Sequence, residues 1–143
     1  MVINEMRLTI DSRSVNESFG RTVVAAFAAQ LDPTVEEIND IKTAVSEAVT
    51  NCIVHGYKNS LGKIYITVRI HDNGKVIISI RDKGCGIDDI SKAREPLFTT
   101  VGGDRAGLGF SVMESFMDKL TVRSKVGYGT TVTLCKIIKG RTK

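Results

Sequence analysis

Hydrophobic and polar residues alternate in several stretches of the chain, and each stretch predicts a strand. Residues 6–10 place Met, Leu and Ile between polar neighbours, which indicates an opening strand. Residues 64–70 and 76–80 alternate in the same way, and Asp72-Asn73-Gly74 between them is typical of a hairpin turn. The middle of the chain is therefore expected to form two antiparallel strands.

Two helices are predicted between the opening strand and the hairpin. Ser14-Val15-Asn16-Glu17 and Thr34-Val35-Glu36-Glu37 each place a hydroxyl residue three positions before a glutamate, the pattern of an N-terminal capping box. The first helix is expected to run to about Gln30, because Asp32-Pro33 breaks it. The second is expected to end near Gly56.

The C-terminal part begins with a stretch of little periodicity over residues 88–106, which we expect to be a flexible lid with a short helical piece near Ile90–Arg94. A helix should follow from Gly107–Gly109 to Met117, and then strands over 120–124 and 130–138. The order of elements predicts an α+β fold. We expect a two-layer α/β sandwich, in which helices cover one face of a mixed, mostly antiparallel sheet.

Length and composition limit the class of protein. A chain of 143 residues fits one domain, here residues 1–143, with its own core. No run of about 18 apolar residues exists, so we expect no transmembrane helix and no membrane partner. The first residues lack the features of a signal peptide, and we expect a cytoplasmic protein. The three cysteines, Cys52, Cys85 and Cys135, lack the spacing of a zinc site or a disulfide framework.

The formal net charge of +4 is unevenly distributed. Residues 1–50 contain eight acids and four bases, whereas residues 51–143 contain eight acids and sixteen bases. A basic half suits phosphates, an acidic partner or nucleic acid. The bases are scattered without interleaved aromatic residues, so we expect no direct nucleic-acid partner. A few bases around a polyphosphate would suffice.

The stretch Asp82-Lys83-Gly84-Cys85-Gly86 begins where the second strand of the predicted hairpin ends. A carboxylate followed by two glycines places an acceptor beside backbone that can approach a flat ligand closely. Asp82 can accept a hydrogen bond from an adenine amino group while Gly84 and Gly86 admit the ring. A turn that only terminates the strand is the alternative.

Glu47 and Asn51 lie one turn apart on the predicted second helix, away from its main apolar face. A solvent-exposed polar side is one interpretation. Ala44 and Val54 flank the same side, which favours a side that a ligand or a lid covers. An Asn carbonyl oxygen suits Mg²⁺, and a Glu near a γ-phosphate can receive a proton from an attacking hydroxyl or water.

Glycines at the start of the third predicted helix offer backbone N–H groups to phosphates. Gly107 and Gly109 lie at the N-terminus of this helix. Arg105 adds a cation for the phosphates, and a solvated arginine of the loop is the alternative interpretation. The chain has no P-loop and no dinucleotide fingerprint. It also lacks the motif set of eukaryotic protein kinases.

Taken together, these motifs resemble the Bergerat-type ATP-binding fold shared by DNA gyrase, Hsp90, bacterial histidine kinases and MutL. The matching residues are Glu47 and Asn51 for the N box, Asp82-x-Gly84-x-Gly86 and Gly107-x-Gly109 for the two glycine boxes, and Thr130-Thr131-Val132 for the final adenine-side position. Neither His55 nor His71 precedes the domain on a helical hairpin, as the acceptor of a histidine kinase would. The branch that the chain resembles is the free-standing serine/threonine kinases, the bacterial anti-sigma factors. Over residues 3–138 it is similar to the anti-sigma F factors of spore-forming bacteria, and the residues that carry this likeness include Ser46-Glu47-Ala48-Val49-Thr50-Asn51, Pro96-Leu97-Phe98-Thr99-Thr100 and Val112-Met113-Glu114-Ser115-Phe116-Met117-Asp118.

The resemblance implies a homodimeric protein serine/threonine kinase that binds and inhibits a sporulation sigma factor. It implies that the kinase uses Mg·ATP to phosphorylate a serine of an anti-anti-sigma protein. The resemblance implies that Glu47 is the general base and that Asn51 is the Mg²⁺ ligand. It implies adenine contacts for Asp82 and Thr130, and it implies that Gly84, Gly86, Gly107 and Gly109 shape the ATP/ADP and phosphate site. It also implies that Arg105 contacts the γ-phosphate and that Arg21 binds the protein partners. For Arg21 an ordinary surface arginine is the alternative. An ATP-binding interaction module without transfer and a stand-alone ATPase are the alternative functions.

Overall fold

The strands of the protein form a single sheet. The structure is a computed structural model, and it describes residues 1–58, 60–94 and 109–140. The five strands have the order β1-β2-β3-β5-β4, and every neighbouring pair is antiparallel. They are β1 (Val2–Asp11), β2 (Lys63–His71), β3 (Lys75–Asp82), β4 (Lys119–Lys125) and β5 (Gly129–Ile137). The predicted α+β sandwich is confirmed, with described strands that are antiparallel throughout.

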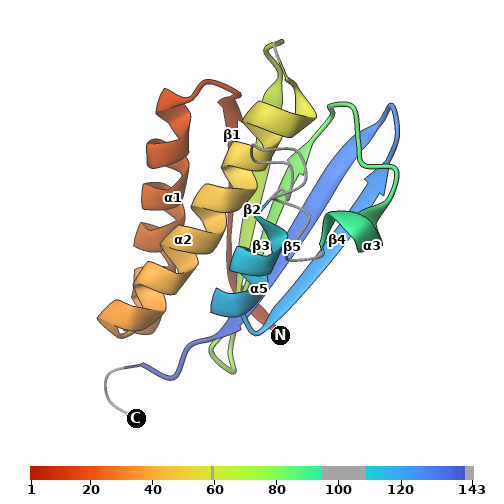
Figure 1. The fold of residues 1–143 in the computed structure, drawn as a ribbon. Helices are drawn as coiled ribbons and strands as arrows, with labels where there is room; N and C mark the ends of the chain where they lie inside the picture. Colours follow the sequence, from red (N-terminus) through yellow and green to blue (C-terminus); the bar gives the residue numbers. More distant parts are fainter. Residues whose placement is uncertain (59, 95–108, 141–143) are drawn as a thin grey trace.

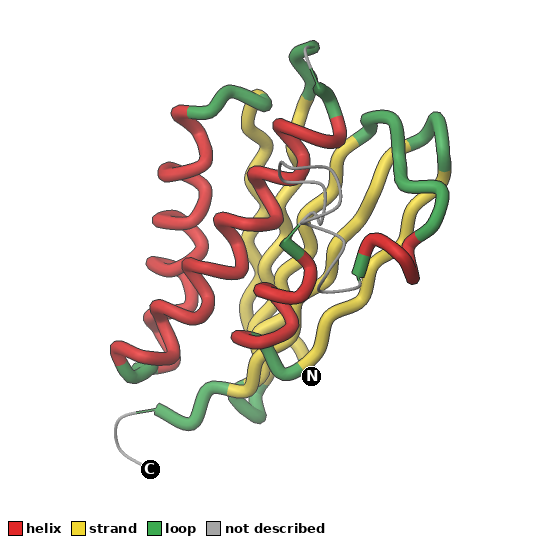
Figure 2. Tube along the Cα trace, viewed as in Figure 1, coloured by secondary structure: helices red, strands yellow, loops and turns green. Residues whose placement is uncertain are grey.

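The helices lie together on one face of this sheet (Figures 1 and 2). They are α1 (Val15–Ala28), the short 3₁₀ helix η1 (Ala29–Leu31), α2 (Val35–Asn51), the π-helical turn η2 (Cys52–Gly56), α3 (Ile90–Ala93) and α5 (Phe110–Phe116). The short helical piece expected near Ile90–Arg94 is confirmed as α3. The rest of the expected loop, with Pro96 and Gly102-Gly103, lies outside the described residues. None of the described helices has the length and apolarity needed to cross a membrane.

The core lies between the helices and the sheet, as the alternation in the strands predicts. Ile64, Ile66, Val68 and Ile70 of β2 all point toward the helices and are almost completely buried. They meet the apolar face of α2, where Ile41, Val45 and Val49 are fully buried. Burial of each such side chain contributes roughly 1.5–3 kcal/mol to stability. This packing fixes which side of α2 is left to face other elements.

The two predicted capping boxes have different outcomes. Ser14 has helical backbone angles (φ −55°, ψ −37°), and its side chain makes no capping hydrogen bond, so the first box is wrong. The chain already turns at this point, because the Asn16 N–H donates to the Arg13 carbonyl (2.9 Å), and Glu17 forms an ion pair with Arg21 instead. The second box is confirmed. Thr34 is extended and accepts from the Glu37 N–H (3.1 Å), and Glu37 accepts from the Thr34 N–H (2.8 Å).

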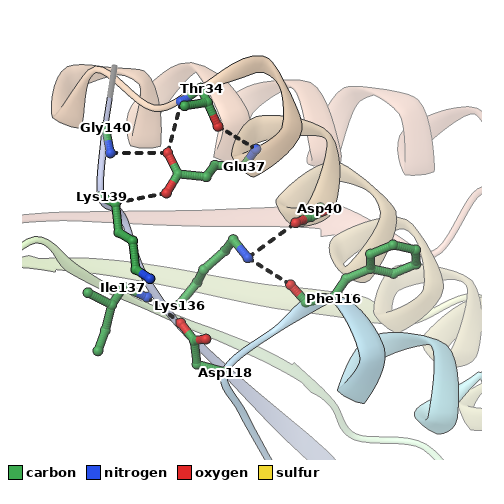
Figure 3. A network of polar contacts seen from close by, with 9 residues as sticks. All are labelled: Thr34, Glu37, Asp40, Phe116, Asp118, Lys136, Ile137, Lys139 and Gly140. Atoms are coloured by element: carbon green, nitrogen blue, oxygen red, sulfur yellow. Dashed lines mark hydrogen bonds and ion pairs between the residues drawn. The ribbon is translucent and has the colours of Figure 1, made fainter. Parts of the chain in front are cut away.

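Glu37 also holds the segment that follows β5 against α2 (Figure 3). Its carboxylate accepts from the backbone N–H groups of Lys139 (2.8 Å) and Gly140 (3.2 Å). Nearby, the Lys136 ammonium donates to Asp40 (3.3 Å) on α2 and to the Phe116 carbonyl (2.9 Å) at the end of α5. These contacts tie α2, α5 and β5 together, so the position of α2 over the sheet is set at its N-terminal end.

Candidate functional site

A cavity of about 510 Å³ opens between the C-terminal end of α2, the sheet and α3. Its volume lies in the range of small-molecule sites in proteins. Most of its wall is apolar, and it includes Ala48, Ile80, Ile87, Phe110 and Val132. The polar residues in the wall include Asn51, Asp82, Thr130 and His55. The cavity can therefore enclose a largely apolar ligand, and its few polar residues can form hydrogen bonds with that ligand.

Asp82 is the buried carboxylate of this cavity. It is the last residue of β3 and only 5% exposed, and its Oδ1 accepts a hydrogen bond from the Gly84 N–H (2.9 Å). Burial raises the pKa of Asp82 above its ordinary value, although the Gly84 N–H and the Cys52 thiol donate hydrogen bonds that oppose the rise. A ligand that donates to this carboxylate would stabilise its charge.

Thr130 lies beside Asp82 because the two residues are direct cross-strand partners in the β3–β5 register. The Thr130 hydroxyl forms a hydrogen bond with the Ser124 hydroxyl (2.8 Å), and Ser124 in turn accepts from the Ile87 N–H (2.7 Å). The two positions expected on the adenine side are thus adjacent, although they are 48 positions apart in the chain. The sheet itself positions them.

Gly84 and Gly86 are required by close backbone contacts within the protein. A Cβ on Gly84 would collide with the Gly56 carbonyl of η2, and one on Gly86 (φ +79°) would collide with the Lys125 carbonyl. Only Gly86 of the two lines the cavity. The glycines therefore let this loop pack between η2 and the β4–β5 turn, where the Cys85 N–H donates to the Gly56 carbonyl (2.9 Å).

Asn51 lines the cavity and is only 8% exposed, so this part of α2 is not a solvent face. Ala44 on the same side is fully buried, because α5 packs against α2 there. Val54 is 44% exposed, and most of the loop expected to cover this side lies outside the described residues. The chain makes a π-helical turn from Cys52, which shifts the side chains that follow.

Glu47 does not line the cavity. Its carboxylate lies against Gly109, the residue that precedes α5, so closely that a Cβ on Gly109 would collide with Glu47 Oε2. Gly109 has a left-handed conformation (φ +68°), and it too lies outside the cavity wall. The structure thus brings together the expected catalytic glutamate and Gly109, the last residue of the second glycine box. Arg105 and Gly107 lie outside the described residues.

Arg21 belongs to a different surface. It lies on α1, its side chain is 38% exposed, and it forms an ion pair with Glu17 one turn earlier (3.0 Å). It is absent from the cavity wall. Its planar guanidinium carries five N–H donors, so a single carboxylate partner leaves donors available.

Sequence reasoning missed several residues of the cavity. Cys52 follows Asn51 and lines the cavity, and its thiol donates to Asp82. Burial raises the pKa of this thiol well above its ordinary value, and the negative charge of Asp82 adds to the rise. His55 also lines the cavity, and so does Lys58 in a left-handed conformation (φ +54°). The signal that could have found them is their position in the turn directly after Asn51.

The residues present fit a magnesium ion only if a ligand brings most of the coordination shell. Within residues 1–58, 60–94 and 109–140, no group of three or more His, Cys, Asp or Glu side chains could hold a metal. Asn51 lines the cavity, and its side chain carries one amide oxygen. Mg²⁺ commonly keeps several waters and takes the remaining oxygens from phosphates, so a single neutral oxygen ligand suits it.

The chain also matches a known domain family and several known proteins. The model of the histidine kinase-like ATPase domain matches residues 12–136. A protein of Thermoanaerobacter pseudethanolicus named anti-sigma F factor is 61% identical over 136 residues, which cover 94% of each chain. The anti-sigma F factor of Geobacillus thermodenitrificans is 56% identical over 137 residues, covering 94% of this chain and 93% of the other.

Two solved structures share the fold. The RsbU and RsbW domains of a Mycobacterium tuberculosis protein match with a TM-score of 0.68 and 21% identity, over 94% of this chain and 32% of that one. The histidine kinase domain of a blue-light activated kinase from Erythrobacter litoralis matches with a TM-score of 0.58 and 17% identity, over 85% of this chain and 60% of that one. At these identities the likeness concerns the arrangement of the elements.

Proposed function

The chain belongs to the histidine kinase-like ATPase domain family and, within it, to the anti-sigma F factors, and on this basis we propose that it is an ATP-dependent serine kinase that also sequesters a sporulation sigma factor. Its protein substrate is an anti-anti-sigma factor, which loses its ability to release the sigma factor once a serine is phosphorylated. Residues 1–143 act as one domain and associate as a homodimer.

One observation carries the nucleotide part of the proposal: Asn51, Asp82 and Thr130 come from three different elements and line the same cavity. Adenine lies at the Asp82 end, where its amino group donates to the carboxylate and the Thr130 hydroxyl adds a polar contact. The apolar wall around Ile80 and Val132 covers the ring. Gly86 and Gly84 hold the loop that shapes this end.

The phosphate end lies toward Asn51 and the start of α5. Asn51 would hold Mg²⁺ through its amide oxygen, and the bound ion would neutralise charge on the phosphates. Gly107 and Gly109 shape the phosphate site, and Arg105 contacts the γ-phosphate. Asp82 and Asn51 thus orient the two ends of ATP or ADP within one cavity.

Glu47 is the general base of the transfer. Its carboxylate takes the proton from the serine hydroxyl of the antagonist while the serine oxygen bonds to the γ-phosphorus and the bond to the β-phosphate oxygen breaks. The products are a phosphoserine, ADP and one proton held by Glu47. The carboxylate lies beside Gly109 at the start of α5, which is the side from which a phosphoryl group would be presented.

Arg21 binds the protein partners. It lies half-exposed on α1, and the same helix exposes Phe19 to 52% and Val15 to 75%. A guanidinium beside exposed apolar side chains is typical of the residues that carry most binding energy in protein interfaces. The sigma factor and its antagonist would compete for this surface.

The test is incubation of the purified protein with Mg·ATP and the anti-anti-sigma protein, followed by mass measurement of the latter. The kinase proposal predicts a gain of one phosphate on one serine. ATP-dependent sigma-factor binding without this gain would favour the interaction module. Release of inorganic phosphate without modification of the antagonist would favour a stand-alone ATPase.

A further inference from the structure

The π-helical turn η2 lies between the two ends of the cavity that Asn51 and Asp82 mark. It follows Asn51 directly in the chain, and it closes with a hydrogen bond from the Tyr57 N–H to the Cys52 carbonyl (2.9 Å). Single π-helical turns occur frequently at functional sites. This turn sets the direction in which the chain leaves α2, and it brings the chain against the glycine loop, residues 82–86.

The backbone of η2 is in direct contact with the glycine loop. The Cys85 N–H donates to the Gly56 carbonyl (2.9 Å), and the Cys85 thiol donates to the His55 carbonyl (3.2 Å). A Cβ on Gly56 would collide with the Asp82 carboxylate, and a Cβ on Gly84 would collide with the Gly56 carbonyl. The two segments therefore pack without space for a side chain between them, so a displacement of η2 would also displace Asp82.

Tyr57, the residue after η2, connects this contact to the sheet through its hydroxyl. The hydroxyl accepts from the Lys83 N–H (2.8 Å) and donates to the Lys63 carbonyl. At this end of the sheet the cross-strand partners of β2 and β3 finish with Ile64 and Asp82, and Lys63 and Lys83 are the residues next to them. The Tyr57 hydroxyl thus bridges the two chain segments where the strand pairing ends, directly after the buried carboxylate.

The Tyr57 ring is held in place by Gly62, the residue before β2. A Cβ on Gly62 would collide with the ring. Gly62 is itself fixed to the end of β1, because its N–H donates to the Ser12 hydroxyl (2.9 Å) and its carbonyl accepts from the Ser12 N–H (2.9 Å). Burial raises the pKa of Tyr57 above its ordinary value, so the hydroxyl keeps its proton at neutral pH and can donate to the Lys63 carbonyl.

We propose that Tyr57 is a positioning residue for nucleotide binding, whose hydroxyl holds the Lys83 backbone so that the Asp82 carboxylate faces the adenine amino group. This role rests on the proposed ATP site. A binding group keeps its geometry only when its neighbours hold it within about 0.5 Å, and hydrogen bonds from the surrounding residues supply this support. Tyr57 itself is absent from the cavity wall, so its effect on a ligand passes through Asp82.

Two nucleotides distinguish positioning of Asp82 from general support of the fold. Because Tyr57 acts through Asp82, its hydroxyl should matter only for ligands that donate to that carboxylate. Purine riboside triphosphate has a hydrogen atom where ATP has the amino group, and it keeps the ring, sugar and phosphates of ATP. Loss of the Tyr57 hydroxyl should therefore weaken the binding of ATP and leave the binding of this analogue nearly unchanged.

The test is isothermal titration of the full-length chain with each of these nucleotides in the presence of Mg²⁺. Tyr57→Phe keeps the ring and should weaken ATP binding about threefold or more, the effect of one lost neutral hydrogen bond. The affinity for the analogue should change less than about twofold. Gly62→Ala, which displaces the same ring, should reproduce this pattern.

Tyr128→Phe is the matched control, because it removes the same group at the β4–β5 turn. Tyr128 is 69% exposed and absent from the cavity wall, and its hydroxyl forms no hydrogen bond within the described part of the chain. This variant should change the affinity for neither nucleotide. Kinetics of the proposed transfer add a second readout. In Tyr57→Phe the KM for ATP should rise about threefold or more, while kcat at saturating ATP stays within about twofold.

Equal weakening of both nucleotides by Tyr57→Phe would overturn the positioning role, because the hydroxyl would then support the whole cavity. An unchanged affinity for ATP would overturn this role too, and it would leave the proposed ATP site standing. If the wild type bound both nucleotides equally, the adenine contact of Asp82 would be contradicted, and the role of Tyr57 with it. If the wild type bound neither, the proposed ATP site itself would be wrong.

Discussion

The carboxylate of Glu47 lies where a Cβ atom on Gly109 would stand. Glu47 belongs to the middle of α2, and Gly109 precedes α5 with a left-handed backbone. The contact joins two motifs that the sequence keeps 62 positions apart. It explains why glycine is needed at this position, because both the conformation (φ +68°) and the neighbouring carboxylate exclude a side chain.

Gly109→Ala should therefore displace the proposed base. We expect phosphate transfer to fall about a hundredfold, the size of effect that a displacement of about 1 Å can have on a reacting group. Gly127→Ala is the matched control, because Gly127 is also left-handed (φ +85°) but a Cβ there has no atom within 4 Å. Both variants should lose roughly 1–2 kcal/mol of stability from backbone strain. Equal loss of transfer in the two would show that strain, and not the contact with Glu47, is responsible.

Asp82→Asn should weaken ATP binding about tenfold or more, because the neutral amide removes a charged acceptor for the adenine amino group. Isothermal titration of the nucleotide would measure the change. Guanine nucleotides present a carbonyl at the corresponding position, so their binding should not weaken. An unchanged affinity for ATP would contradict the adenine role of Asp82.

The same substitution should stabilise the protein without nucleotide at neutral pH. Burial raises the pKa of Asp82 above its unfolded value, so the fold favours the protonated carboxyl and is penalised once the group is charged. The wild type should gain stability relative to Asp82→Asn as the pH falls toward the unfolded pKa near 3.8. Urea unfolding at several pH values measures the difference in free energy of unfolding between Asp82→Asn and wild type. If the advantage of Asp82→Asn grew as the pH fell, the prediction would be contradicted.

Nucleotide should protect Cys85 from alkylation. The Cys85 side chain is exposed and lines the cavity at the glycine loop, whereas Cys52 is buried. We expect Cys85 to react first with iodoacetamide and Cys52 last, with ATP slowing the reaction of Cys85 severalfold. Cys135 lies on the face of the sheet opposite the helices and provides the internal control. Equal protection of Cys135 would indicate a general tightening of the fold.

Glu37→Ala should destabilise the protein by about 1–2 kcal/mol, since it removes a helix cap and the acceptor for the backbone N–H groups of Lys139 and Gly140. Glu36→Ala, in the same turn but exposed, should have a much smaller effect. Burial opposes the charge of Glu37, but the backbone N–H groups of Thr34, Lys139 and Gly140 hold its pKa below the ordinary value.

The Glu37 charge therefore contributes stability above the unfolded pKa near 4.5, and this contribution disappears as the pH falls through the lower folded pKa. The difference between wild type and Glu37→Ala should shrink in acid. Thermal unfolding between pH 3 and pH 7 provides the comparison. If the difference in stability between wild type and Glu37→Ala were constant between pH 3 and pH 7, the destabilisation would come from lost packing and not from the Glu37 charge.

Periodicity predicted most of the fold, because alternating residues in β2 and β3 can bury only one face of a sheet. The hairpin at Gly74 (φ +85°) was predictable for a similar reason, since its turn needs a residue tolerant of that conformation. The absence of a side-chain cap at Ser14 was not predictable, because the preceding residues already form a turn that the local pattern does not reveal. The same holds for the π-helical turn that begins at Cys52.

The residue types of the site were predictable, but several of their contacts were not. A strand-end carboxylate and two glycines indicate a flat ligand, yet the register that pairs Asp82 with Thr130 depends on the whole sheet. Gly84 was expected to admit a ligand ring, and the structure shows that it avoids the Gly56 carbonyl. These relationships arise between elements distant in sequence, where local patterns carry no information.

The most direct test of the account measures phosphate transfer and ATP binding in the same samples of wild type and Glu47→Gln. The amide keeps the size of the carboxylate but cannot take a proton at neutral pH. We predict that Glu47→Gln binds Mg·ATP within about twofold of wild type and transfers phosphate to the antagonist's serine at least about a hundredfold more slowly. Transfer at the wild-type rate, measured by the mass of the antagonist over time, would contradict the assignment of Glu47 as the base.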